Sequence, residues 1–264
     1  MEILEWKRNL ESDYGYTTNK LLATADSSRN ITEITQNYTQ IDESGVEEIL
    51  RTIPNVEKLF HGIGIDLGGG VSLISSCIMK IFDPQKIFCI EIVEEAVRKC
   101  HQSVQKFILG SNTDKITSVI GDFDHLELED NSLDFAIFWD SLHHAREPLI
   151  SLKECKRVLK KTGFVIIIDK AHDNSVPDAE IERMLNVQYD EFFLEKSYRS
   201  KDTVLFRKDE GEHEYRFFEW ENFFINSGFK IIENFLIKTE IQNNAYKKND
   251  NNLKEIFVKF NVGG

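Results

Sequence analysis

The chain has 264 residues, of which 41% are hydrophobic and 29% are charged, so it is long enough to bury the core of one enlarged globular domain. Its 45 acidic residues outnumber its 32 basic residues, and a net charge of −13 disfavours a nucleic-acid partner because such a surface repels phosphates. Charged residues interrupt the N-terminus, and every apolar run is far shorter than the about 20 residues that span a bilayer, so neither a signal peptide nor a membrane partner is expected.

Residues 1–60 are predicted to form an N-terminal helical cover, within which a helix over about residues 45–52 ends before Pro54. From residue 61 to residue 264, apolar runs rich in β-formers alternate with stretches of helical periodicity, which predicts one domain with a parallel, doubly wound sheet. The predicted strands cover about residues 62–67, 86–91, 116–121, 133–139 and 164–169. The predicted helices between them cover about residues 71–79, 93–109 and 148–159.

The alternation of strands and helices breaks over residues 171–217, a stretch that is too long for an ordinary connection. We expect a partly helical insertion here, which would lie as a lid over the ligand-binding edge of the sheet. A helix over about residues 218–227 then precedes strands over about residues 229–237 and 255–261, which only a polar loop separates. Because no helix joins these two strands, they predict an antiparallel hairpin at the edge of a seven-stranded, Rossmann-like α/β sheet.

A glycine-rich motif, Asp-Leu-Gly-Gly-Gly, occupies residues 66–70 directly after the first strand of this sheet. Glycines at this position let the backbone turn tightly and approach a ligand without a Cβ in the way. Their order differs from the GxGxxG pattern of dinucleotide-binding proteins, which argues against a nicotinamide-dependent oxidoreductase. The carboxylate of Asp66 favours a ligand with a cationic amino group over a pyrophosphate, and a turn without any ligand is the structural alternative.

Three further strands of the predicted sheet also end in acidic residues. Glu91 ends the second strand, where an acid about 20 residues after the glycine turn can accept both hydroxyls of a ribose. The sequence Gly-Asp-Phe at residues 121–123 ends the third strand, and Asp-Ser-Leu-His-His at residues 140–144 ends the fourth. Open α/β sheets bind ligands at the rim where the carboxyl ends of their strands meet, so these acids predict a ligand site there.

Together these residues resemble the class I S-adenosylmethionine-dependent methyltransferases, over about residues 46–169 and again from about residue 218. The similarity is greatest to the small-molecule branch that includes ubiquinone- and menaquinone-biosynthesis enzymes. It implies a methyltransferase with S-adenosylmethionine as cofactor, in which the glycine turn holds the methionine end, Glu91 the ribose and residues 122–123 the adenine. Ser72 stands where the family often has a third glycine. The cofactor-binding residues that the resemblance implies are Asp66, Gly68, Gly69, Gly70, Glu91, Ile92, Asp122, Phe123, Asp140 and His143.

The methyl acceptor is harder to predict than the cofactor. The family's DNA- and RNA-amino-methylating members carry a Pro-Pro-aromatic sequence after the fourth strand, whereas this chain has Asp-Ser-Leu-His at residues 140–143 and no Pro-Pro in its sequence. With the net charge of −13, this departure favours O-methylation of a small molecule, such as a sugar, a nucleotide-linked sugar or another metabolite. A tRNA or protein methyltransferase and a non-catalytic module that only binds S-adenosylmethionine remain open alternatives.

Methyl transfer to a hydroxyl needs alignment and either a base or a metal that lowers the pKa of the hydroxyl. Four of the seven histidines fall at predicted rim positions, and a histidine suits the role of base near neutral pH. Each of them can instead pack in the core or face solvent. The candidate catalytic residues are His144, His172, His213 and Asp140. The candidate ligands for Mn²⁺ or Mg²⁺ are His144, His172, His213, Asp169 and Glu214.

The other histidines and the cysteines indicate structural roles and a compartment. His61, His101 and His125 fall outside the rim loops and are predicted to be structural or exposed. The four cysteines form no CxxC pair and are typical of reduced core residues, which predicts a cytoplasmic protein. The expected partner is a small-molecule acceptor, and a homodimer remains open.

Overall fold

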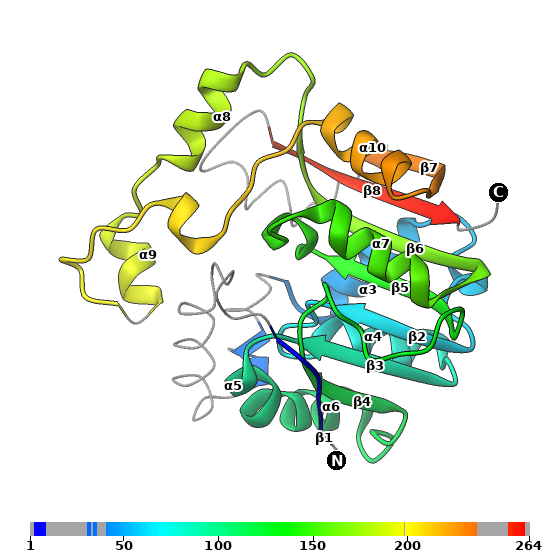
Figure 1. Ribbon diagram of the computed structural model, residues 1–264. Helices are drawn as coiled ribbons and strands as arrows, with labels where there is room; N and C mark the ends of the chain where they lie inside the picture. The colour runs from blue at the N-terminus through cyan, green and yellow to red at the C-terminus, as the bar shows by residue number, and fades with distance from the viewer. Residues whose placement is uncertain are drawn as a thin grey trace.

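The structure, a computed structural model, describes residues 3–8, 31–32, 34–35, 41–197, 199–236 and 253–261. At its centre is an eight-stranded sheet with helices on both faces (Figure 1). The strands are β1 (Ile3–Glu5), β2 (Ile63–Leu67), β3 (Lys86–Glu91), β4 (Ile116–Ile120), β5 (Leu133–Trp139), β6 (Leu159–His172), β7 (Lys230–Leu236) and β8 (Leu253–Asn261). The α-helices are α3 (Glu43–Thr52), α4 (Leu73–Phe82), α5 (Glu94–Ala96), α6 (Gln102–Leu109), α7 (Pro148–Val158), α8 (Asp178–Leu185), α9 (Glu191–Lys196) and α10 (Phe217–Asn226). Short 3-10 helices are η2 (Val56–Lys58), η4 (Leu142–His144) and η5 (Arg207–Glu210), and η3 (Val97–His101) is a π-helical turn.

The sheet has the strand order β1-β4-β3-β2-β5-β6-β8-β7. Every neighbouring pair from β1 to β6 is parallel, whereas β8 runs antiparallel to both β6 and β7. This arrangement confirms the predicted Rossmann-like α/β fold, mostly parallel with an antiparallel hairpin at one edge. The number of strands exceeds the predicted seven by one, because residues 3–5 add β1 beside β4. Three residues are too few for an alternating pattern to reveal, and pairing with the open edge of β4 is what makes them a strand.

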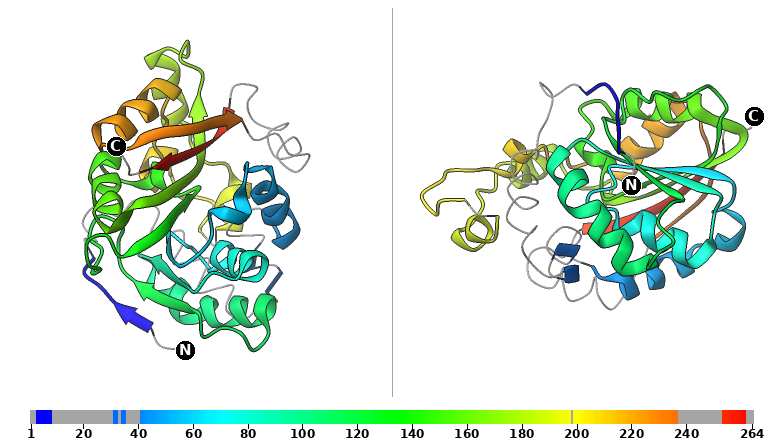
Figure 2. Two further views of the ribbon diagram at one scale, coloured as in Figure 1. Left: turned by 90° about the vertical axis from the view of Figure 1, so that its right-hand side faces the viewer. Right: turned by 90° about the horizontal axis from the view of Figure 1, so that it is seen from below.

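Helices lie on both faces of the sheet (Figure 2), and the apolar side chains between the helices and the sheet form two hydrophobic cores, one on each face. On one face α3, α4 and α6 cover the sheet, and the buried rings of Phe60 and Phe135 meet edge to face with centroids 5.2 Å apart. On the other face α7 and α10 cover it. There Trp220 stacks on Phe224 with centroids 5.8 Å apart, and its Nε1 donates to the carbonyl oxygen of Lys170 at 2.8 Å. Because both faces are covered, the centres of β5 and β6 are apolar throughout.

Two helices differ from the sequence-based prediction for local physical reasons. The helix α3 begins two residues earlier than expected, because Asp42 caps it by accepting a hydrogen bond from the N–H of Gly45 at 3.0 Å. The helix expected over residues 93–109 is not regular, since the π-helical turn η3 separates α5 from α6. A π turn closes i→i+5 hydrogen bonds, which hydrophobic periodicity does not reveal.

The structure describes part of the expected cover and, except for residue 198, the whole expected lid, but not the expected hairpin loop. Residues 9–30 of the cover expected over residues 1–60 lie outside the described residues, as does the polar loop over residues 242–252. The insertion expected over residues 171–217 contains α8, α9 and η5, which lie beyond the carboxyl ends of the parallel strands (Figure 1). In the described ranges, no helix is both long and apolar enough to cross a membrane.

Candidate functional site

The glycine turn at residues 68–70 lies at the carboxyl end of β2, in the middle of the sheet. Gly68 and Gly70 have positive φ angles of 77° and 54°, which residues with a side chain rarely adopt. A Cβ on Gly68 would come within 2.6 Å of the Cβ of Ser141. A Cβ on Gly69 would come within 2.4 Å of the Sγ of Cys89. The turn has no room for side chains, so a ligand at the rim can approach its backbone closely.

Asp66 lies at the end of β2, enclosed beneath the glycine turn and 1% exposed. Its Oδ2 accepts hydrogen bonds from the backbone N–H of Ser75 at 3.1 Å and from Ser75 Oγ at 2.6 Å. Burial raises the pKa of Asp66 to about 6, because the charged carboxylate is poorly solvated there. Its other oxygen, Oδ1, is buried and has no hydrogen-bond partner among the described residues.

Glu91, at the end of β3, is attached to the glycine turn. Its Oε2 accepts a hydrogen bond from the N–H of Gly70 at 2.9 Å, and its Oε1 accepts one from the N–H of Val93 at 2.8 Å. Each carboxylate oxygen can accept more than one hydrogen bond, so this oriented group suits a pair of hydroxyls. The carbonyl of Ile92 accepts from Arg8 Nη1 at 3.0 Å. The segment after β1, which lies within the cover expected over residues 1–60, therefore reaches this end of the site.

Phe123, which follows β4, also lies at the glycine turn. The ring of Phe123 comes within 3.6 Å of the position that a Cβ on Gly68 would take. The same ring packs edge to face on Phe138, with centroids 5.7 Å apart. Asp122 Oδ1 accepts a hydrogen bond from the N–H of Asp124 at 3.1 Å. The structure thus brings residues from the ends of β2, β3 and β4 together around one turn, as the sequence predicted.

The loop that carries the two adjacent histidines is joined to the same turn. Ser141 Oγ donates to the carbonyl of Leu67 at 2.7 Å. His143, which is 1% exposed, donates its backbone N–H to Asp169 Oδ2 at 3.1 Å, and its Nδ1 lies 2.7 Å from Asp169 Oδ1. Burial works to lower the pKa of His143, but the charge and hydrogen bond of Asp169 outweigh it, so the pKa is raised. This environment favours the imidazolium form of His143.

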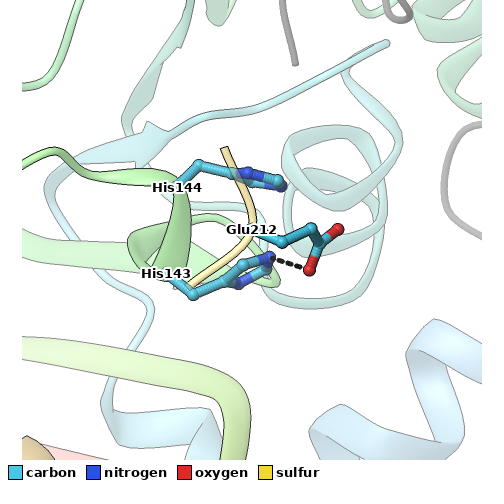
Figure 3. A group of neighbouring side chains, drawn as sticks. All are labelled: His143, His144 and Glu212. Carbon is cyan, nitrogen blue, oxygen red and sulfur yellow. Dashed lines mark ion pairs between the residues drawn. The ribbon is translucent and has the colours of Figure 1, made fainter. Parts of the chain in front are cut away.

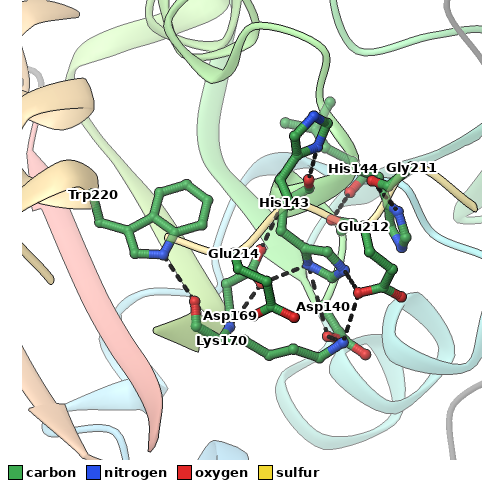
Figure 4. A network of polar contacts seen from close by, with 12 residues as sticks. Asp140, His143, His144, Asp169, Lys170, Gly211, Glu212, Glu214 and Trp220 are labelled. Carbon is green, nitrogen blue, oxygen red and sulfur yellow. Dashed lines mark hydrogen bonds and ion pairs between the residues drawn. The ribbon is translucent and has the colours of Figure 1, made fainter. Parts of the chain in front are cut away.

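Beside this loop lies a charge cluster that consists of Asp140, His143, Asp169, Lys170 and Glu212 (Figure 4). Lys170 Nζ lies 3.5 Å from Asp140 Oδ1 and 3.7 Å from Glu212 Oε2. Glu212 Oε2 also lies 3.8 Å from Nε2 of His143 (Figure 3). Burial opposes the charge of Lys170, but Asp140 and Glu212 raise its pKa well above the ordinary value. Burial likewise opposes the charge of Glu212, but Lys170 and His143 lower its pKa, so opposite charges alternate through the cluster.

Asp140 is the exposed member of the charge cluster. Its side chain is 53% exposed, and its backbone has a φ of 48° in the left-handed region. That conformation costs a residue other than glycine about 1 kcal/mol. Partial burial works to raise the pKa of Asp140, but the charge of Lys170 outweighs it and the pKa is lowered. A strained, ionised residue at the rim is typical of a functional site.

His144 is the neutral histidine of the pair. Its ring packs on that of His143 with centroids 4.1 Å apart, and its Nδ1 lies 3.2 Å from the carbonyl oxygen of Gly211. Because a carbonyl only accepts, Nδ1 carries the hydrogen and Nε2 keeps a lone pair. Burial and the charge of His143 lower the pKa of His144 to about 4. In the described part of the chain its Nε2 makes no hydrogen bond, so it is a neutral base.

The other two predicted catalytic histidines make separate contacts. His172, 1% exposed, places Nε2 2.5 Å from Glu214 Oε2, and Glu214 also forms an ion pair with Arg207. His213 Nδ1 donates to the carbonyl of His143 at 2.8 Å. The end of the insertion is therefore tied to the rim. Of the three predicted histidines, His172 is buried, whereas His144 and His213 are partly exposed.

Two groups of described residues could hold a metal, with ligand atoms within 4.8 Å of one another: His143 with His144 and Glu212, and Asp140 with His143 and Asp169. The set proposed from the sequence was His144, His172, His213, Asp169 and Glu214, and the structure does not bring these five together. Glu212 and Lys170 are the site residues that sequence reasoning missed. Each is adjacent in sequence to a residue that was a candidate. Only contacts across the rim reveal which charged side chain faces the loop that carries His143 and His144.

Residues 65–167, which include the glycine turn and the loop after β5, match a family model described as a methyltransferase domain. No curated protein matches the sequence. Among solved structures, the [4+2]-cyclase SpnF is similar with a TM-score of 0.63 and 12% identity, over 94% of this chain and 93% of that chain.

Two structures that involve methyltransferases are similar as well. Geranyl diphosphate methyltransferase in complex with S-adenosylmethionine has a TM-score of 0.59 and 9% identity, over 84% of this chain and 86% of that chain. A complex of the Haloferax volcanii Trm112 methyltransferase activator with a protein assigned as a methyltransferase has a TM-score of 0.59 and 15% identity, over 94% of this chain and 98% of that chain. At these identities the structural similarity shows the fold alone.

The opposite environments of the adjacent histidines predict opposite titration behaviour. His143 should titrate above the ordinary histidine pKa of about 6.5, and His144 should have a pKa of about 4. NMR of the ring protons, assigned with His143→Gln and His144→Gln, measures both values. In Asp169→Asn the pKa of His143 should fall, because the charge that stabilises the imidazolium is gone.

The raised pKa of His143 also predicts how the stability of the fold changes with pH. Because the pKa of His143 is raised on folding, its contribution is complete below the unfolded pKa of about 6.5 and is lost as pH rises through the folded pKa. Urea unfolding across this range should show that loss in the wild type and a smaller one in Asp169→Asn. Titration of both histidines together near pH 6.5 would show that the two rings share one environment, contrary to the geometry.

Proposed function

Because this chain belongs to the class I S-adenosylmethionine-dependent methyltransferases, we propose that it O-methylates a small-molecule acceptor with His144 as general base. The observation that carries the proposal is a neutral imidazole on the loop that Ser141 joins to the glycine turn. S-adenosylmethionine supplies a methyl group on a sulfonium, which an acceptor oxygen can attack as it loses its proton. The protein would hold the cofactor, align the acceptor and take that proton.

The residues around the glycine turn fit the parts of S-adenosylmethionine. The glycines of the turn carry no side chain that would keep a ligand from its backbone, and Oδ1 of Asp66, which has no partner among the described residues, would accept a donor from the methionine end. Glu91, oriented by the N–H of Gly70, would accept the ribose hydroxyls. The ring of Phe123, beside the turn, would contact the adenine. This fit supports the cofactor assignments that the resemblance implies.

The proposed base chemistry follows from the protonation state of His144. Its Nε2 lone pair would take the proton of the acceptor hydroxyl while the oxygen forms a bond to the methyl carbon and the carbon–sulfur bond breaks. The nearby carboxylate of Glu212 acts to raise the pKa of His144, so it would stabilise the imidazolium that forms. Asp140, expected to be both a catalytic and a cofactor-binding residue, and His143, expected to bind the cofactor, would orient the base and its surroundings.

The charges around His143, His144 and Glu212 favour a base over a metal. A metal held by His143, His144 and Glu212 would add positive charge beside Lys170, whose Nζ is already 3.7 Å from Glu212. The ammonium of Lys170 balances Asp140 and Glu212 without an ion. A divalent metal would have to compete with that ammonium, so we propose that the reaction is independent of metal.

The alternatives differ in the acceptor and in whether transfer occurs. The net charge of −13 supports a small acceptor over a polynucleotide. The similar Haloferax protein is bound to an activator protein, so the second candidate function is methylation of a macromolecule with the help of a protein partner. The similar fold of a [4+2]-cyclase shows that this architecture also serves other chemistry. Both alternatives are outcomes of the experiments below.

Binding of S-adenosylmethionine is the first consequence. Gly68→Ala should weaken binding by about tenfold or more, because the added Cβ would meet Ser141 at 2.6 Å on a backbone with a φ of 77°. Gly110→Ala is the matched control, since Gly110 also has a positive φ, of 63°, but no atom lies within 4 Å of an added Cβ. Calorimetric titration measures both. Equal affinity for NAD, or wild-type affinity in Gly68→Ala, would contradict the cofactor assignment.

The role of His144 is the second consequence. His144→Gln should lower kcat by about 10²-fold or more while the Kd of S-adenosylmethionine stays unchanged, because the base acts on the acceptor. His61→Gln, an exposed histidine outside the rim, serves as the control and should keep wild-type turnover. Transfer of a tritiated methyl group to a panel of hydroxylated small molecules, to tRNA and to proteins measures both the rate and the acceptor class.

The pH and metal dependence of the same assay separate the alternatives. Because the pKa of His144 is lowered to about 4, the rate should be constant from about pH 6 to about pH 8 and fall only as acid protonates the base. Excess EDTA should leave the rate unchanged. Loss of activity in EDTA that Mn²⁺ restores would contradict the proposed base and indicate a metal. Label on tRNA or protein would contradict the proposed small-molecule acceptor.

A further inference from the structure

A buried polar network lies beneath the glycine turn and takes no part in the chemistry described above. It consists of Ser72, His101, Gln105 and Ser118, each with 0% exposure. We propose that His101, through this network, positions the glycine turn for S-adenosylmethionine, an inference that rests on the proposed cofactor site. His101 is then a positioning residue, since it acts through Gly70 and does not touch the ligand.

The hydrogen bonds determine the tautomer of His101. Its Nε2 lies 2.9 Å from the carbonyl oxygen of Gly70, and because a carbonyl only accepts, Nε2 carries the hydrogen. Burial lowers the pKa of His101 to about 4, so Nδ1 is unprotonated and accepts from Ser118 Oγ at 2.9 Å. A neutral imidazole with one donor and one acceptor therefore connects β4 to the glycine turn.

Gln105 extends the network to the far end of the turn. Its Nε2 lies 3.1 Å from Ser72 Oγ and 3.2 Å from Ser118 Oγ, and its two hydrogens supply both bonds. Ser72 precedes α4 with a φ of 72°, a conformation that suits glycine. The bond from Gln105 thus holds a serine where the resembling family often has a third glycine.

The π-helical turn η3 brings His101 to this position. His101 is the last residue of η3, and Gln105 follows four residues later, so the two side chains share one face of the helix. The wider turn adds one residue, which rotates the face that follows by about 100° relative to an uninterrupted helix. A regular helix would therefore present other side chains to the glycine turn. Such π turns occur frequently at functional sites.

Gly70 is held on both sides. Its N–H donates to Glu91 Oε2 at 2.9 Å, and its carbonyl accepts from His101 at 2.9 Å. Without His101, that carbonyl would lose its donor, and the backbone at Gly70 could rotate. The rotation would also move the N–H that orients Glu91. Because Glu91 is the proposed ribose acceptor, a change at His101 reaches the cofactor through Gly70.

Calorimetric titration of S-adenosylmethionine into His101→Leu and His101→Gln, at a temperature where both remain folded, tests this role. His101→Leu should raise the Kd by about tenfold or more, since both hydrogen bonds are lost. His101→Gln should recover most of the affinity, because its amide can donate to Gly70 and accept from Ser118. Ser227→Ala, which removes a buried hydroxyl at the end of α10, is the control and should keep the wild-type Kd even if its Tm falls.

Hydrogen exchange of the protein without cofactor gives a second readout. Peptides that cover residues 66–75 should lose protection in His101→Leu and keep it in Ser227→Ala. If the wild type binds the cofactor, but His101→Leu keeps both its Kd and its protection, the positioning role is overturned and the proposed function stands. If the wild type does not bind S-adenosylmethionine, both the proposed function and the cofactor role of His101 fail. The hydrogen-exchange result then still decides whether His101 holds the glycine turn in place.

Discussion

The rest of the site depends on one constraint, which is the close approach of the segment after β2 to the segment after β5. At Gly68 the backbone runs so close to Ser141 that an added Cβ would lie 2.6 Å from it, with a φ of 77° that suits glycine. A ligand over the glycine turn therefore also lies beside the loop that carries His144. In the proposed reaction, cofactor and base are adjacent because these two strand ends touch.

The charge cluster shows how the insertion takes part in the rim. Buried charges cost several kcal/mol each unless opposite charges and hydrogen bonds compensate them. Here Lys170 and His143 each lie between two carboxylates, and Glu212, which serves both cations, comes from the insertion. Removal of the insertion would leave both cations short of a partner. We infer that the segment around Glu212 is as much a part of the site as the strand ends, beyond its expected role as a lid.

The order of strands and helices along the chain was enough to predict the sheet and the rim at which its strands end. The carboxyl ends of parallel strands meet at one rim of the sheet. An acid at the end of each strand therefore predicted the position of Asp66 and Glu91 as soon as the fold was predicted. Contacts between distant segments were not predictable: Glu212 could not be told from its acidic neighbours. His101 was correctly predicted to be structural or exposed, but its contact with Gly70 was not foreseen, because a π turn leaves no signature in hydrophobic periodicity. The strand β1 was missed for a related reason, since only its pairing with β4 defines it.

A crystal structure of the protein with S-adenosylhomocysteine would test the central claim most directly. The account predicts the ribose hydroxyls within hydrogen-bonding distance of Glu91, the sulfur over the glycine turn, and Nε2 of His144 facing the side of the sulfur from which the methyl group is lost. A ligand bound away from residues 68–70, or a sulfur that faces His172 and Glu214 instead of His144, would contradict it.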